Sequence, residues 1–246
     1  MRNAFHDDLD HISEQLVEMT RVAGSAIARA TTALVDADLH MAEDVITGDR
    51  TLDLARETLD ELAIDVLARQ QPVATDLRVV VTALRMSADL ERMGDLARHV
   101  AKVARLRYPL SAVPPSMRSL VLEMGQVAER IVAKAGSVIA ARDVDLAISL
   151  EKDDDAMDEL HRRVFTALHN TKLPTETIVD LTLLGRYYER FTRKGLTNGG
   201  PGEILHCPDS ESAFGLLESY MELYDLTGEA RWLSCARDAA NQAASW

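Results

Sequence analysis

The segment DLERMGDLARHVAK, residues 89–102, carries two carboxylates at a spacing suited to cation binding. Glu91 and Asp95 are four positions apart, so a helix would place them one turn apart on one face. Carboxylates presented in this way can bridge a hard cation such as Mg²⁺ or Mn²⁺. The same spacing fits a solvated helix end at which Asp95 pairs with Arg98 or His99, since such ion pairs are common and weak. Spacing alone leaves both interpretations open.

The helix that carries this pair must also bury a face. On a helical wheel, one apolar seam runs from Val79 to Ala104. A second face is apolar over residues 77–88 and becomes charged over residues 91–102. We therefore expect the two carboxylates to lie where this second face emerges from the core.

Apolar residues three and four positions apart continue through the chain up to about residue 191 and predict an all-α fold. The seams are narrow, as in antiparallel helical bundles. Pro114 and Pro115 make the strongest break, because neither can lie inside a helix. They divide six predicted helices three and three, with the remaining breaks at 38–41, 71–76, 142–145 and 171–175.

The two halves repeat one another, which indicates a three-helix unit used twice. Asp38, Ala42 and Val45 recur 105 positions later as Asp143, Ala147 and Leu150, and Glu91 recurs as Glu189. The repeat also contains acidic pairs at the spacing of Glu91 and Asp95. These secondary candidates for metal contact are Asp49 with Asp53 and, in the second half, Asp154 with Asp158.

Composition narrows the possible functions. The 246 residues have a net charge of −13, which disfavours nucleic-acid binding because phosphate attraction dominates that affinity. Cys207 and Cys235 show no pairing pattern, and no apolar run is long enough to span a membrane. The charged N-terminus does not resemble a signal peptide. We expect a soluble cytoplasmic protein that reaches the inner face of the membrane only through partners.

QQPVATDLR (70–78), followed by DLERMGDLARHVAK, closely resembles the signature of the PhoU family. The resemblance covers about residues 1–191 and includes TIVDLTLLGRYYERF (177–191). It implies a six-helix, two-repeat bundle without enzymatic activity. It further implies a negative regulator of phosphate uptake and of the phosphate-starvation (Pho) response. Such proteins act as metal-binding adaptors between the ATPase subunit of the phosphate ABC transporter and a sensor histidine kinase.

The family motif E(D)xxxD implies a metal cluster on the third helix of each repeat, with Fe, Zn, Mn or Mg as the ion. Glu91 and Asp95 match the first motif in full, with His99 as a candidate outer ligand. In the second motif Glu189 is retained, but Arg193 stands at the position of the other carboxylate. A guanidinium has no acceptor atom and cannot coordinate metal. We therefore expect the second site to be lost or much weakened.

The character of the chain changes after about residue 192. We expect domains at 1–110 and 116–194, the second with a shortened last helix, then a Gly-rich linker at 195–210 and a helical hairpin at 211–246. Residues 203–246 weakly resemble one hairpin of an α/α-toroid protein of the six-hairpin glycosidase kind. We expect a natural fusion, a frameshift or an artefact, which the sequence does not distinguish.

The sequence also bears on three other functional classes. A ferritin-like metalloenzyme needs Glu-x-x-His pairs on two helices, and residues 1–191 contain none. A glycosidase needs two acids across a cleft, which one hairpin cannot build. A nonfunctional or partly folded hybrid of a PhoU-like protein with a fragment of a carbohydrate enzyme stays an alternative, as does a homodimer.

Overall fold

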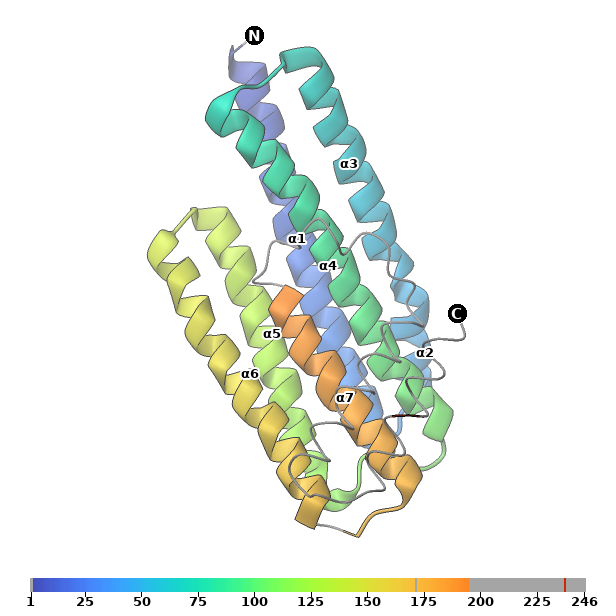
Figure 1. The fold of residues 1–246 in the computed structure, drawn as a ribbon. Coiled ribbons are helices and arrows are strands. Elements are labelled where there is room, and N and C mark those ends of the chain that lie inside the picture. Colours follow the sequence, from blue (N-terminus) through green and yellow to red (C-terminus); the bar gives the residue numbers. More distant parts are fainter. Residues whose placement is uncertain (1, 171, 195–236, 238–246) are drawn as a thin grey trace.

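Figure 1 shows a bundle of long helices in this computed structural model, which describes residues 2–170, 172–194 and 237. Every regular element in these residues is helical, and this confirms the all-α prediction. The first half contains α1 (Arg2–Asp36), α2 (Leu39–Gly48), α3 (Arg50–Gln70) and α4 (Ala74–Arg107). The second half contains the short 3-10 turn η1 (Pro115–Met117), α5 (Arg118–Ala141), α6 (Val144–Asn170) and α7 (Thr175–Lys194).

The helices end where the sequence predicts, with one difference. Residues 39–70 were expected to form a single helix, and the structure divides them at Asp49 into α2 and α3. Gly48 has a low helix propensity, and the amide of Leu52 bonds to the Asp49 carbonyl three residues back rather than four. Asp49 itself keeps helical dihedral angles, so α2 and α3 together take the place of one helix of a six-helix bundle.

The internal repeat is visible in how two helices begin. The Asp38 carboxylate accepts a hydrogen bond from the amide of Met41 at 3.0 Å at the start of α2. The Asp143 carboxylate accepts the same bond from Leu146, also at 3.0 Å, at the start of α6. A side-chain cap of this kind stabilises a helix by about 1 kcal/mol. The repeat in the sequence is thus matched by the same helix cap in both halves of the structure.

The first helices of the two halves, α1 and α5, pack closely through two threonine–glycine contacts. Thr31 of α1 lies against Gly125 of α5, and Thr20 lies against Gly136. A Cβ atom at either glycine would clash with the facing threonine. Only glycine therefore permits this approach of the two helices.

The third helices of the two halves, α4 and α7, are joined by an ion pair between the C-terminal end of α4 and the first turns of α7. The Arg107 guanidinium donates to Asp180 at 2.5 and 3.1 Å and to Glu176 at 2.9 Å. Tyr188 of α7 is fully buried, and its hydroxyl shares a hydrogen bond of 2.8 Å with Thr31 of α1. These contacts fix α7 against both helices.

The predicted linker and hairpin at 195–246 lie outside the described residues, apart from Arg237. The predicted shortening of the last helix also concerns residues beyond Lys194, where the described part of α7 ends. Among the described helices, none is long and apolar enough to cross a membrane.

Candidate metal site

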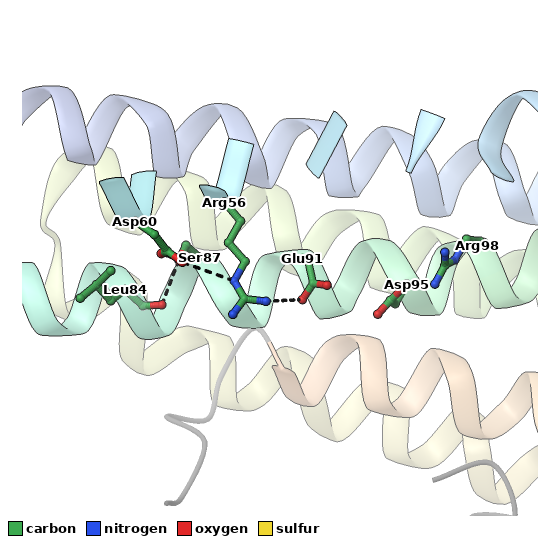
Figure 2. A network of polar contacts seen from close by, with 7 residues as sticks. All are labelled: Arg56, Asp60, Leu84, Ser87, Glu91, Asp95 and Arg98. Carbon is green, nitrogen blue, oxygen red and sulfur yellow. Dashed lines mark hydrogen bonds and ion pairs between the residues drawn. The ribbon is translucent and has the colours of Figure 1, made fainter. Parts of the chain in front are cut away.

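Glu91 and Asp95 project from the middle of α4, as Figure 2 shows, where α3 runs alongside. Their side chains are 22% and 17% exposed, so neither is a freely solvated surface carboxylate. Asp49, at the junction of α2 and α3, is more deeply buried, with 6% of its side chain exposed. Asp53 follows one turn later on α3 and is half-buried. The acidic residues predicted from the first repeat therefore lie on α4, at the α2–α3 junction and on the first turn of α3.

Arg56 links α3 to the first of these carboxylates. Its guanidinium donates to Glu91 at 3.1 Å and also lies 3.7 Å from Asp60, one turn along α3 (Figure 2). Ser87 of α4 donates a hydrogen bond of 3.2 Å to the same Asp60. The sequence patterns did not single out Arg56, because its partner lies on another helix.

Arg98 links the other two carboxylates. It forms an ion pair with Asp95 one turn before it on α4, and a second at 3.0 Å with Asp49. The pairing of Asp95 with Arg98, one of the two alternatives from spacing, is thus present. One guanidinium bridges the α2–α3 junction and α4.

Burial disfavours the charged form of two of these carboxylates. It raises the pKa of Asp49 to about 6, and the charges of Asp95 and Asp53 add to the rise while Arg98 and Lys102 oppose it. Burial also raises the pKa of Glu91, with Asp95 adding to the effect and Arg56 opposing it. The arginines therefore offset only part of the cost of ionising these buried groups.

Gly94 makes room for the Asp49 carboxylate. A Cβ atom at this position of α4 would lie 3.2 Å from Asp49 Oδ1 and 2.5 Å from Leu52 Cδ1. Asp49 and Gly94 also line a hollow on the surface between α1, α2 and α4. Glycine at position 94 therefore lets α4 approach Asp49 and Leu52 closely, and the hollow lies on the solvent side of this contact.

The side chains described above do not form a set of metal ligands in their present positions. Among the described residues, no three His, Cys, Asp or Glu side chains come together closely enough to hold an ion. The oxygens of Glu91, Asp95 and Asp49 instead contact guanidinium groups. The carboxylate oxygens suit a hard cation, and Asp49 lines the surface hollow. Arg98 would have to withdraw from Asp49 and Asp95 to admit it.

His99, the candidate outer ligand, lies against α7. Its ring centroid is 5.3 Å from that of Tyr187, and its buried Nδ1 makes no hydrogen bond within the described part. Burial lowers the pKa of His99, and the positive charge of Lys102 adds to the effect. The imidazole is therefore neutral at pH 7 and packs between the two halves.

The second repeat has a different arrangement at the equivalent positions. Glu189 of α7 is 4% exposed and contacts two arginines, Arg193 at 2.8 Å and Arg186 at 3.3 Å. Burial raises the pKa of Asp154 on α6, and hydrogen bonding from Thr192 opposes the rise. Arg193, the departure noted in the sequence, thus pairs directly with the carboxylate that it follows by one turn.

A family model described as "PhoU domain" matches this chain twice, over residues 16–104 and 121–195. The chain belongs to the PhoU family. The two matches correspond to the two halves of the bundle, and this confirms the resemblance inferred for residues 1–191.

Several PhoU homologs are similar over the same part of the chain. The "Phosphate-specific transport system accessory protein PhoU homolog 2" of Mycobacterium tuberculosis is 45% identical over 193 residues, covering 78% of this chain and 91% of that protein. A PhoU homolog of Aquifex aeolicus is 31% identical over 188 residues, covering 74% and 84%. These relatives are accessory proteins, and membership in their family supports the prediction that this chain is not an enzyme.

Solved PhoU structures share the fold. The crystal structure of PhoU from Pseudomonas aeruginosa has a TM-score of 0.71 and 27% identity, covering 78% of this chain and 93% of that one. PhoU from Streptococcus pneumoniae has a TM-score of 0.69 at 20% identity, which supports the fold alone. This agreement confirms the six-helix PhoU-like bundle. No finding supports the predicted α/α-toroid resemblance of residues 203–246, and the chimera inferred from it is not retained.

Proposed function

We propose that this chain is an accessory regulator of phosphate-specific transport and a repressor of the phosphate-starvation response. The similarity to PhoU homologs across both halves of the bundle is the observation that supports this proposal. In the proposed role, the chain acts in the cytoplasm without catalysis. It forms an adaptor between the ATPase subunit of the phosphate transporter and a sensor histidine kinase.

We further infer that the first repeat binds a divalent cation through Asp49, Glu91 and Asp95. The partly buried carboxylates of Asp49 and Glu91, whose ionised forms are disfavoured by burial, and the surface hollow that Asp49 lines support this inference. The cation, Mg²⁺, Mn²⁺, Zn²⁺ or Fe²⁺, would supply positive charge between the α2–α3 junction and α4. Arg98 supplies that charge in its absence, so the ion and the guanidinium compete for the same oxygens.

Metal content of the whole chain tests the site. After dialysis against Mn²⁺, the wild-type protein should retain metal, and the double variant Glu91→Gln, Asp95→Asn should retain none. Arg98→Gln should bind Mn²⁺ at least about tenfold more tightly, because removal of one competing cation is worth about 1.4 kcal/mol or more. Asp44→Asn, which removes a carboxylate from an exposed ion pair with Arg29, is the matched control. Unchanged metal content in the double variant would show that the site is assigned wrongly.

The adaptor role has a separate test. The chain should co-purify with the transporter ATPase subunit or with the sensor kinase. In a strain that lacks its own PhoU, it should restore repression of a phosphate-starvation reporter in phosphate-rich medium. A folded protein that retains neither partner and does not restore repression would contradict the role.

A further inference from the structure

The two halves of the bundle place different charges at equivalent positions. The carboxylate Glu91 corresponds to Glu189, and each lies on the third helix of its half. One turn later the first half has Asp95, whereas the second half has Arg193. The same duplicated framework therefore presents an acidic pair in one half and an acid–base pair in the other.

Both oxygens of the Glu189 carboxylate are occupied by cations of the chain. Arg193 Nε lies 2.8 Å from Oε1, and Arg186 Nη1 lies 3.3 Å from Oε2. The Glu189 side chain is 4% exposed and Arg186 is 18% exposed, whereas Arg193 reaches the same carboxylate from a side chain that is 57% exposed. Glu91, by contrast, has a contact from Arg56 at one oxygen, Oε2, and its side chain is 22% exposed.

The second half carries a side chain where the first half has glycine. Thr192 occupies the position that corresponds to Gly94, and its hydroxyl donates to the Glu189 carbonyl at 2.9 Å. The same Thr192 lies near Asp154, the counterpart of Asp49, and opposes the rise in pKa that burial causes there. The close approach that Gly94 allows in the first half is thus replaced by a contact through a threonine side chain in the second.

The two arginines also act on a histidine of the neighbouring helix. His161 on α6 packs against Gly185 of α7, in contact with the helix that carries Glu189. Burial lowers the pKa of His161 to about 4, and the charges of Arg186 and Arg193 lower it further while Asp158 opposes them. The positive charge that pairs with Glu189 therefore extends to the adjoining part of α6.

We propose that Arg193, with Arg186, is a permanent counter-ion in the second half and takes the place that a metal ion would otherwise fill. Arg193 is then the residue that determines specificity: it restricts divalent-cation binding to the first half. Replacing it by aspartate recreates the acidic pair and converts the second half into a cation site. The restriction to the first half rests on the proposed metal site there, but the conversion does not.

Mn²⁺ titration of the full-length protein, followed by calorimetry and elemental analysis, tests this proposal. In the Glu91→Gln, Asp95→Asn background, Mn²⁺ binding should be absent. Adding Arg193→Asp to that background should restore it, with affinity rising at least about tenfold. Arg162→Asp makes the same charge change at an exposed pair with Glu159 on α6 and should restore nothing.

Stability provides a second measurement. In EDTA, Arg193→Asp should lower the melting temperature, because buried Glu189 loses a cation and gains a like charge one turn away. Mn²⁺ should reverse that loss. If Arg193→Asp does not fold, Arg193→Asn removes the cation without adding the charge, and it should show weaker Mn²⁺ binding of the same origin.

The outcomes separate this proposal from the first-half site. Metal that survives Glu91→Gln, Asp95→Asn in the otherwise wild-type chain and disappears with Glu189→Gln would overturn the role of Arg193. A folded Arg193→Asp protein without Mn²⁺ binding in that background would overturn it as well. If the wild type binds no Mn²⁺ but Arg193→Asp does, the first-half site is wrong and the role of Arg193 stands.

Discussion

Asp49→Asn should make the metal-free protein more stable at neutral pH. Burial holds the pKa of Asp49 at about 6 in the folded chain against 3.8 for an ordinary aspartate. A raised folded-state pKa gives a contribution to stability that is complete below pH 3.8 and is lost as the pH rises through 6. The ionised carboxylate therefore weakens the fold above that range, and the asparagine side chain stands in for the protonated acid.

The magnitude follows from the two pKa values. At 1.36 kcal/mol per unit, the shift corresponds to about 3 kcal/mol at pH 7.5 and about 1 kcal/mol at pH 4.5. The stability of Asp49→Asn relative to wild type should thus increase by about 2 kcal/mol between these pH values. Comparing the two pH values cancels any effect of the substitution that does not depend on pH, including altered packing.

Urea unfolding followed by circular dichroism, in EDTA at both pH values, measures this difference. Asp44→Asn, at an exposed ion pair, should change the free energy of unfolding by less than about 1 kcal/mol at either pH. If Asp49→Asn gains no stability relative to wild type between pH 4.5 and 7.5, ionisation of Asp49 does not lower the free energy of unfolding. A cation at this position would then have no unfavourable carboxylate charge to relieve.

Two further substitutions test the packing that positions the site. Gly94→Ala should lower the free energy of unfolding by about 1–3 kcal/mol, because its Cβ would lie 2.5 Å from Leu52 Cδ1. Urea unfolding measures this loss. An unchanged unfolding midpoint would contradict the close approach of α3 and α4. Asp180→Asn should lower the free energy of unfolding by about 1.5–3 kcal/mol, since Arg107 loses the charge of its buried partner and keeps only Glu176. Thermal unfolding measures this loss, with Asp36→Asn at an exposed ion pair as the control.

The fold could be predicted because its signals are local. Helix breaks depend on prolines and turn residues, and the repeat could be read from matched positions such as Asp38 and Asp143. The division at Asp49 was missed because a single glycine inside an apolar pattern is a weak signal. The burial of Asp49 could not be predicted either, because it depends on the distance between α3 and α4, which sequence periodicity does not give.

The partners of the acidic residues were harder to predict. The pairing of Asp95 with Arg98 follows from spacing on one helix, as does that of Glu189 with Arg193. The contact between Arg56 and Glu91 spans 35 positions and joins two helices. Sequence periodicity gives the face on which a side chain lies but not the residue that it meets across an interface.

The threonine–glycine contacts between α1 and α5 form a symmetric interface within one chain. Thr20 and Gly125 are 105 positions apart, as are Thr31 and Gly136, so the two contacts exchange under the shift that relates the halves. Such an interface is isologous, as in a two-fold dimer of identical subunits.

Its large and small residues, however, are divided between the halves. Two first halves would bring Thr20 against Thr31 and clash, whereas two second halves would bring glycine against glycine and leave a gap. Each half is therefore shaped to recognise the other and to reject its own copy. After duplication, the two halves of one chain carry complementary surfaces, with threonines on one half and glycines on the other.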